Sequence, residues 1–201
     1  MPSLQAIYEK YLPTHNVEHH GDKGTSHSYI DAYESLLLPY REVSNLRLLE
    51  VGVAEGLSLQ MWRDYFSDGA TIIGCDISDS WLSPETANAF DIIIGNSKVP
   101  STRKAIERFA PFDIIIDDGD HNPWAQLLTY YSLFPLLRSG GMYVIEDIAN
   151  LDSWEHEFRS LQPNVEVFDL RKLKNRQDDS LIVLRRPAVE ESATAWAGLS
   201  R

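Results

Sequence analysis

The 201-residue sequence has a single cysteine, Cys75, and few positively charged side chains. One cysteine cannot form an intrachain disulfide, and its scarcity is typical of proteins from a reducing cytoplasm. The 18 lysine and arginine residues face 30 acidic residues, which gives a net charge of -12. This charge disfavours nucleic acids and anionic membranes as partners, because both require a positive protein surface.

Long hydrophobic runs are also absent. No stretch approaches the ~20 apolar residues that span a bilayer. The start, "MPSLQAIYEKYLP", lacks the basic residues and apolar middle of a signal peptide. We therefore expect a cytoplasmic protein without a membrane or nucleic-acid partner. A homo-oligomer formed through the N-terminal helices is possible, although no clear pattern supports it.

Hydrophobic residues make up 43% of the chain, enough for the core of one domain. Apolar runs alternate with helical patterns in the middle of the sequence, as expected for a parallel sheet covered on both faces. The predicted strands cover 46–52, 70–78, 90–97, 112–119 and 140–148. The predicted helices between them cover 56–66, 101–110, with Ser101 as N-cap, and 123–138, with one or two further helical turns between 83 and 89.

The end of the chain breaks this rhythm. Two strand-like runs within 165–187 are separated by a polar region too short for a crossover helix, which predicts an antiparallel hairpin at one sheet edge. The predicted fold class is therefore α/β, with a doubly wound, mostly parallel, seven-stranded sheet. We expect N-terminal helices and a polar loop over 1–45, the core over 46–187 and a tail over 188–201.

Ligands of open α/β sheets bind beyond the carboxyl ends of the strands. The first strand ends in "EVGVAEG", which places Glu50, Gly52 and Gly56 before a helix. Glycines permit a tight turn and close approach of a ligand. The spacing G-x-A-x-G departs from the dinucleotide fingerprint, and Glu50 disfavours a pyrophosphate and suits a cationic ligand. A plain glycine turn between strand and helix is the alternative.

Two further strand ends carry polar residues in register with this turn. Asp76 ends the second strand, where a carboxylate can accept hydrogen bonds from both ribose hydroxyls of an adenosine-type cofactor. Asn96 and Ser97 follow the third strand and could face the adenine edge. Each residue alone could simply cap a helix, but together they predict an adenosine site.

Several segments resemble class I S-adenosylmethionine-dependent methyltransferases, over roughly residues 20 to 186. They are "LLEVGVAEGLSLQMW", "IIGCDIS", "FDIIIDDGDH", "FPLLRSGGMYVIEDI" and "SLIVLRR". More narrowly, "HGDKGTSHSYIDAYE", the D-D-G-x-H run and "YVIEDI" are similar to metal-dependent sugar O-methyltransferases of macrolide and related antibiotic pathways. The same motifs resemble the cephalosporin-hydroxylase-like group.

The resemblance implies a Rossmann-like core and a role for each matching residue. Glu50, Gly52 and Gly56 would hold the methionine end of S-adenosylmethionine, with Asp76 on the ribose and Asn96 and Ser97 near the adenine. The loop containing Lys23 would fold over the cofactor, with Lys23 binding its carboxylate or positioning acidic residues of the rim. Asp117 is grouped with these cofactor-site residues, in a structural or supporting role.

The resemblance also implies that Asp118, Glu146 and Asp147 bind a divalent metal and that His121 is the general base. The family has a small residue where this chain has Asp120, so the chain departs from the family pattern at this position. The chain also has little room for the extra N-terminal segments or lid insertions of the antibiotic enzymes. Sugar specificity therefore does not transfer.

The residues favour a metal independently of the resemblance. The fourth and fifth strands are expected to be neighbours, ~4.8 Å apart, which brings Asp118 and the Glu146–Asp147 pair to one rim. Clustered carboxylates raise one another's pKa, and a divalent cation removes that conflict. Oxygen ligands favour Mg²⁺, Mn²⁺ or Ca²⁺ over zinc. The alternative is that these acids cap helices or are solvated, and that His121 is a polar residue at a helix N-terminus.

The leading hypothesis is an S-adenosylmethionine- and metal-dependent O-methyltransferase acting on a hydroxylated small molecule, with a sugar or glycosylated natural product as the expected acceptor. A hydroxylase-like oxidoreductase is the second hypothesis, disfavoured because no convincing 2-His-1-carboxylate pattern is present. A non-catalytic cofactor-binding domain is the third. The set of Asp118, His121, Glu146 and Asp147 argues against that last possibility.

Overall fold

The computed structural model describes residues 1–12 and 21–188. His19 and His20 of the predicted loop, and residues 189–201 of the predicted tail, lie outside the described residues. Seven strands form one sheet in the order β3-β2-β1-β4-β5-β7-β6. Their bounds are β1 Arg47–Val51, β2 Thr71–Asp76, β3 Asp91–Ile94, β4 Phe112–Asp117, β5 Leu137–Glu146, β6 Glu166–Asp169 and β7 Ser180–Arg185.

The first five strands pair in parallel, whereas β7 pairs antiparallel with both β5 and β6. The predicted Rossmann-like, doubly wound sheet with a C-terminal antiparallel hairpin is therefore confirmed. The connection within the hairpin contains one short helix, α9 Arg171–Lys174. After β3 the chain returns to the other side of β1 and adds β4, so the order of strands reverses between β1 and β4.

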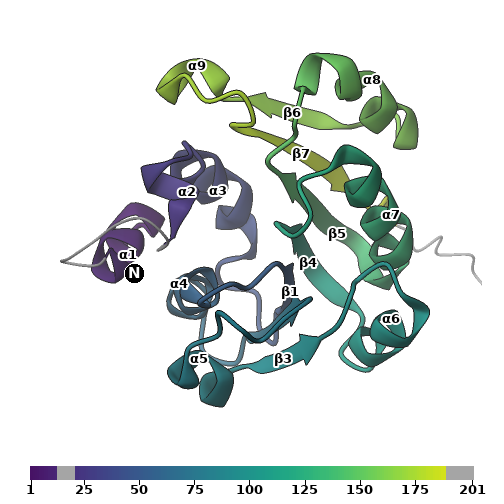
Figure 1. Ribbon diagram of the computed structural model, residues 1–201. Coiled ribbons are helices and arrows are strands. Elements are labelled where there is room, and N and C mark those ends of the chain that lie inside the picture. Colours follow the sequence, from purple (N-terminus) through teal and green to yellow (C-terminus); the bar gives the residue numbers. More distant parts are fainter. Residues whose placement is uncertain (13–20, 189–201) are drawn as a thin grey trace, which may run out of the picture.

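Helices lie on both faces of the sheet (Figure 1). The helices α1 Leu4–Tyr11, α2 Asp22–Thr25, α3 Ile30–Leu37 and α4 Leu57–Tyr65 lie on one side, and α6 Pro100–Glu107, α7 Pro123–Leu133 and α8 Leu151–Leu161 on the other. The remaining elements are α5 Pro84–Ala89 and the 3₁₀ turns Leu38–Tyr40 and Phe134–Leu136. Among the described residues, no helix is both long enough and apolar enough to cross a membrane.

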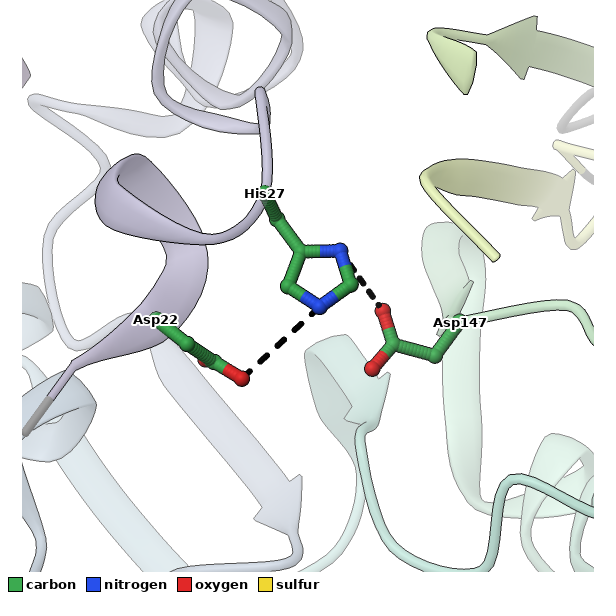
Figure 2. Close-up of side chains that lie close together, drawn as sticks. All are labelled: Asp22, His27 and Asp147. Carbon is green, nitrogen blue, oxygen red and sulfur yellow. Dashed lines mark ion pairs between the residues drawn. The ribbon is translucent and has the colours of Figure 1, made fainter. Parts of the chain in front are cut away.

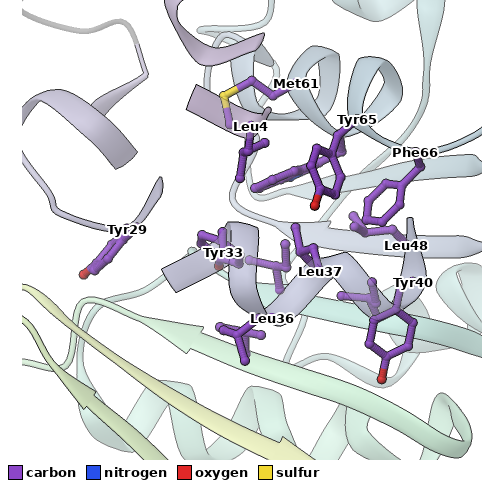
Figure 3. Packing of buried hydrophobic residues seen from close by; sticks show 14 of the residues in the cluster. Leu4, Tyr29, Tyr33, Leu36, Leu37, Tyr40, Leu48, Met61, Tyr65 and Phe66 are labelled. Atoms are coloured by element: carbon purple, nitrogen blue, oxygen red, sulfur yellow. The ribbon is translucent and has the colours of Figure 1, made fainter. Parts of the chain in front are cut away.

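Two hydrophobic cores divide the side chains of the central strands between them. In β4, Ile114 and Ile116 enter the core beneath the N-terminal helices, whereas Ile115 enters the core beneath α6, α7 and α8. This division follows from the two-residue repeat of a strand. Figure 3 shows the first core, where Tyr33 and Leu37 of α3 meet Tyr65 of α4 above the sheet. The N-terminal helices are thus part of the core, and they bring α2 to the rim.

Two local predictions were wrong. The helix predicted over 123–138 ends at Leu133, and a 3₁₀ turn leads into β5, which begins at Leu137 rather than after the glycines. Pro135 explains the early end, because proline donates no backbone hydrogen bond to continue a helix. The predicted N-cap Ser101 lies inside α6, whose N-cap is Val99 followed by Pro100, and proline is favoured at that first helical position.

Candidate active site

Two adjoining cavities open at the carboxyl ends of the parallel strands, beside the point where strand order reverses. The first measures about 500 Å³ and is bordered by α2, the turn after β1 and the end of β4. The second measures about 570 Å³ and lies beyond the ends of β2 and β3. Four residues border both: Gly52, Asp76, Gly119 and His121. An elongated ligand could therefore occupy the two cavities together.

The turn after β1 is shaped by Gly52 and Gly56, which line the first cavity as predicted. Their φ angles are +87° and +86°, in the left-handed region that favours glycine. A Cβ atom on Gly52 would collide with the backbone carbonyl oxygen of Asp118. The close approach of the β1 and β4 ends thus requires glycine at this position.

Asp76 connects this turn to the end of β2. Its Oδ2 accepts hydrogen bonds from the backbone N–H groups of Val53 at 2.8 Å and Ala54 at 3.1 Å, and its Oδ1 accepts from Ser78 at 3.0 Å. The carboxylate also borders both cavities. Asp76 therefore fixes the turn, and lies where a ribose would bridge the two cavities.

Asn96 and Ser97 border the second cavity only. Oδ1 of Asn96 accepts from the backbone N–H of Lys98 at 3.0 Å. The Ser97 hydroxyl lies 3.2 Å from that of Thr129 on α7. Their role beside an adenine stays a prediction, and Ser97 also contributes to packing between the loop and α7.

Lys23 brings an ammonium group among three carboxylates. Its Nζ lies 2.6 Å from Oε1 of Glu146, 2.7 Å from Oδ2 of Asp118 and 3.4 Å from Oε1 of Glu50. Burial opposes the charge on Lys23, but these three acids raise its pKa well above the usual value. Of its two expected roles, the contacts match the positioning of acidic residues. The backbone segment around Lys23 also lines the first cavity.

Glu50 lies behind the glycine turn. Its side chain is fully buried, and its Oε2 accepts hydrogen bonds from Ser58 Oγ at 2.8 Å and Trp62 Nε1 at 3.1 Å. Burial raises its pKa to about 7, although Lys23 acts in the opposite direction. Glu50 is not among the described residues that line either cavity. Glu50 therefore contacts Lys23 rather than either cavity in which a cofactor could lie.

His121 lies between two of the predicted metal ligands. Its Nε2 is 3.3 Å from Oδ1 of Asp118, and its Nδ1 is 3.4 Å from Oδ2 of Asp147. The hydrogen bond with Asp118 raises the pKa of His121 to about 9, against the effect of burial. Conversely, despite burial, Lys23 and His121 hold the pKa of Asp118 below its usual value. The imidazole borders both cavities and is accessible from them.

The three predicted metal ligands, Asp118, Glu146 and Asp147, do not lie in one cluster of the described residues. They are distributed over three clusters, of which two contain Asp118 and two contain Asp147. Among the described residues, the groups with ligand atoms within 4.8 Å of one another are Asp118–His121–Asp147, Glu50–Asp118–Glu146 and Asp22–His27–Asp147. Glu146 and Asp147 are adjacent in sequence at the end of β5 but meet different partners, as expected where successive side chains of a strand point to opposite faces. Asp118 belongs to two of these groups.

The side chains that hold Glu146 and Asp147 come from α3 and the segment before it. Tyr33 donates to Oε1 of Glu146 at 2.5 Å, and Tyr29 donates to Oδ1 of Asp147 at 2.5 Å. Figure 2 shows His27 between Asp147 and Asp22, with Nδ1 3.2 Å from Asp147 Oδ1 and Nε2 3.8 Å from Asp22 Oδ2. The sequence reasoning assigned no role to these residues. The four-residue spacing of Tyr29 and Tyr33, which places both on one helical face, was the available signal.

His27 and His121 both approach the carboxylate of Asp147, but His27 lies near Oδ1 and His121 lies near Oδ2. No group within 4.8 Å among the described residues contains His27, His121 and Asp147 together. The geometry therefore does not favour the 2-His-1-carboxylate iron site that the hydroxylase hypothesis requires.

Asp117 and Asp120 flank this centre in different surroundings. Asp117 is buried at the end of β4, its Oδ2 accepts from Tyr143 at 3.2 Å, and burial raises its pKa to about 7. It lies behind the rim, in a supporting position. Asp120 is exposed and its Oδ2 pairs with Lys98 Nζ at 2.8 Å beside the second cavity. The charge of Asp120 is therefore balanced by Lys98 from a neighbouring loop, and Asp120 belongs to none of the candidate metal clusters of the described residues.

Comparison with known proteins assigns this architecture to a class. Residues 49–148 match the family model described as a methyltransferase domain. A relative from Streptomyces olivaceus, 8-demethyl-8-alpha-L-rhamnosyl tetracenomycin-C 2'-O-methyltransferase, is 34% identical over 139 residues, which are 66% of this chain and 36% of the relative. Demethylmacrocin O-methyltransferase from Streptomyces fradiae is 34% identical over 155 residues, 73% of this chain and 36% of that protein.

Solved structures share the fold. The MycE methyltransferase of the mycinamycin biosynthetic pathway, in complex with Mg, SAH and mycinamycin VI, superposes with a TM-score of 0.70 at 22% identity, over 95% of this chain and 55% of that one. An O-methyltransferase from Bacillus cereus in complex with SAH gives a TM-score of 0.59 at 19% identity, over 92% and 88% of the two chains. The chain spans about a third of the length of the curated relatives it matches.

Proposed function

We propose that this protein is an S-adenosylmethionine-dependent, divalent-metal-assisted O-methyltransferase acting on a hydroxyl of a sugar or glycosylated natural product. The observation that carries the proposal is the joint border of the two cavities, where Gly52, Asp76 and His121 meet beside Asp118. The two named relatives are an O-methyltransferase of a rhamnosyl tetracenomycin-C and an O-methyltransferase of demethylmacrocin, which supports the acceptor class. The SAH and Mg in the MycE structure support the cofactor and metal.

The two cavities suit S-adenosylmethionine in a defined direction. The nucleoside end would lie in the second cavity, beside Asn96 and Ser97, with its ribose at Asp76. The methionine end would lie in the first cavity, against Gly52 and Gly56. The tight backbone turn leaves room there, because neither glycine carries a side chain.

The chemistry of the acidic residues suits a divalent metal. Asp118, Glu146 and Asp147 supply carboxylate oxygens, the ligands that Mg²⁺ and Mn²⁺ prefer. The ammonium of Lys23 already lies against Asp118 and Glu146, which shows that this cluster attracts positive charge. Glu50 Oε1 in the same cluster is buried without a hydrogen-bond partner. Among the described residues Asp118 is common to one group with Glu50 and Glu146 and to another with His121 and Asp147, so the donors around Asp118 fit the ion, whereas the three predicted ligands do not form one group within 4.8 Å.

When bound, S-adenosylmethionine supplies an electrophilic methyl group, and a divalent cation supplies positive charge that acidifies a nearby hydroxyl. His121 is placed to accept the hydroxyl proton at a ring nitrogen, because it borders the cavities beside Asp118. Asp147 orients the imidazole through Nδ1. Transfer would form the bond between the acceptor oxygen and the methyl carbon as the carbon–sulfur bond breaks, and the same two cavities would then hold S-adenosylhomocysteine. Asp76 holds the glycine turn that aligns the reacting atoms.

Two measurements test the proposal. Isothermal titration with S-adenosylhomocysteine should give saturable binding, and methyl transfer from labelled S-adenosylmethionine to glycosylated polyketides should require Mg²⁺ or Mn²⁺. An absence of S-adenosylhomocysteine binding at millimolar ligand would exclude the cofactor. Transfer that survives exhaustive chelation would exclude the metal role while leaving the methyltransferase assignment intact.

A further inference from the structure

The Lys23 ammonium occupies a built cation site. Glu50, Asp118 and Glu146 place one oxygen each within 4.8 Å of one another. Nζ of Lys23 contacts all three, at 3.4, 2.7 and 2.6 Å. The side chains of Lys23 and Glu146 are only 4% and 2% exposed, and that of Glu50 is fully buried. This arrangement is a cation site whose present occupant is an amine of the chain itself.

The charge of this cluster is incompletely balanced. The Lys23 ammonium contacts three carboxyl groups, of which only Asp118 also pairs with His121, and Oε1 of Glu50 has no hydrogen-bond partner despite its burial. Tyr33 supplies a neutral donor to Glu146 but no charge. Buried carboxylates without full compensation are unfavourable, so the cluster retains an attraction for greater positive charge than one lysine provides. A divalent cation would supply it.

Lys23 and a divalent cation cannot both occupy the centre of the cluster. The ammonium is already in hydrogen-bond contact with Asp118 and Glu146, two of the proposed metal ligands. A second cation bound by the same carboxylates would lie a few ångströms from the ammonium, where like charges repel strongly in a partly buried site. One of the two positive charges must therefore move.

We propose that Lys23 and the divalent cation are alternative occupants of the Glu50–Asp118–Glu146 cluster, and that entry of the cation withdraws the ammonium and loosens helix α2 at the sheet rim. This inference rests on the metal requirement of the proposed function. Lys23 is part of α2, and residues of α2 and its flanks line the first cavity, including Gly21, Thr25 and Ser26. Cation occupancy is thereby coupled to one wall of the cofactor cavity, and the coupling is reciprocal.

Lys174 offers a matched control. Its Nζ contacts the same segment through the carbonyl oxygens of Gly24, Thr25 and His27, at 2.6, 2.9 and 2.5 Å. No contact between Lys174 and a carboxylate of the cluster is present in the described structure. Lys174→Met therefore removes the same charge and weakens the same segment without vacating the cation site.

The first experiment measures Mn²⁺ binding by electron paramagnetic resonance of the free ion, for the wild type, Lys23→Met and Lys174→Met. Lys23→Met should bind Mn²⁺ about tenfold more tightly, because the competing ammonium is gone. Lys174→Met should remain within about twofold of the wild type. Equal or weaker binding by Lys23→Met overturns the proposal, as does an equal gain in Lys174→Met, which would assign the effect to loosening alone.

The second experiment uses only the wild-type chain, in case Lys23→Met fails to fold. The amide groups of His27 and Tyr29 donate to the carbonyl oxygens of Asp22 and Lys23, at 2.8 and 2.9 Å, and therefore report the integrity of α2. Saturating Mn²⁺ should accelerate hydrogen exchange at both amides. Unchanged or slower exchange overturns the loosening of α2.

The two proposals can fail separately. If all variants bind S-adenosylhomocysteine but none binds Mn²⁺, the metal part of the proposed function fails and this inference fails with it. If the wild type binds Mn²⁺ and Lys23→Met gains no affinity, only the competition between Lys23 and the cation is wrong.

Discussion

Nε2 of His121 lies 3.3 Å from Oδ1 of Asp118, so the proposed base is paired with a proposed metal ligand. The pairing raises the pKa of His121 to about 9. Below that pH the imidazole carries a proton and cannot accept another. In the absence of a divalent cation, His121 is therefore a poor base at neutral pH.

The pKa of His121 should consequently shift with the metal. A cation bound by Asp118 competes for the charge that stabilises the imidazolium, so saturating Mg²⁺ should lower the pKa of His121 from about 9, as followed by titration of the imidazole by NMR, and kcat measured with Mg²⁺ should rise with pH below that value. His121→Ala should lower kcat by about 10²- to 10⁴-fold and leave the Kd of S-adenosylhomocysteine within about threefold. A rising limb that persists unchanged in His121→Ala would contradict the assignment.

Asp118 should be required for the metal and not for the cofactor. Asp118→Asn removes the charge of a residue shared by two candidate clusters. We expect Mn²⁺ affinity to fall by at least about 100-fold, as measured by paramagnetic resonance. Asp120→Asn is the matched control, because that exposed acid lies two residues away and pairs with Lys98 instead. Equal losses in the two variants would indicate a general effect of charge rather than ligation.

The elements of the sheet could be predicted because each depends on a local pattern. The isoleucine run of β4 is apolar throughout, and both faces of this strand are covered in the structure. The boundary between α7 and β5 was missed, because the apolar residues around Pro135 fit either element and only the proline marks the break. The position of Gly52 followed from the need for a tight turn, which is also local.

The partners of the acidic residues could not be predicted in this way. Lys23 and Glu146 are 123 residues apart, and nothing in either segment indicates that their side chains meet. Tyr33 contacts Glu146 and Tyr29 contacts Asp147, and the sequence of β5 does not indicate that these partners come from the segment around α3. Sequence patterns thus placed the acids at one rim, whereas the pairing among them required the tertiary structure.

Asp76 should contribute to cofactor affinity through the backbone turn as well as through the ribose. Asp76→Ala removes the acceptor for Val53 and Ala54, so we expect the Kd of S-adenosylhomocysteine to rise by about 10- to 100-fold in isothermal titration. The exposed Asp79, three residues further on, provides the control, and Asp79→Ala should bind within about twofold of the wild type. Unchanged affinity in Asp76→Ala would remove it from the cofactor site.

Asp117 should make the protein less stable as the pH rises. Burial raises its pKa from 3.8 to about 7, so the folded state favours the protonated form. Between pH 3.8 and about pH 7 the unfolded state binds fewer protons than the folded state. The free energy of unfolding therefore falls as the pH rises through this range. The penalty for ionising Asp117 should grow by on the order of 2 kcal/mol between pH 5 and pH 8.

Asp117→Asn removes that ionisation and keeps the shape of the side chain and an oxygen that can accept from Tyr143. The free energy of unfolding in urea should therefore exceed that of the wild type at pH 8, and the difference should shrink towards pH 5. Tyr143→Phe serves as the control, because it removes the hydrogen-bond donor and leaves the carboxyl group in place. Loss of the Tyr143 hydroxyl should lower the free energy of unfolding most at high pH, because Asp117 is then ionised and the hydrogen bond stabilises its carboxylate. A difference between Asp117→Asn and the wild type that is independent of pH would show that Asp117 does not titrate in this range.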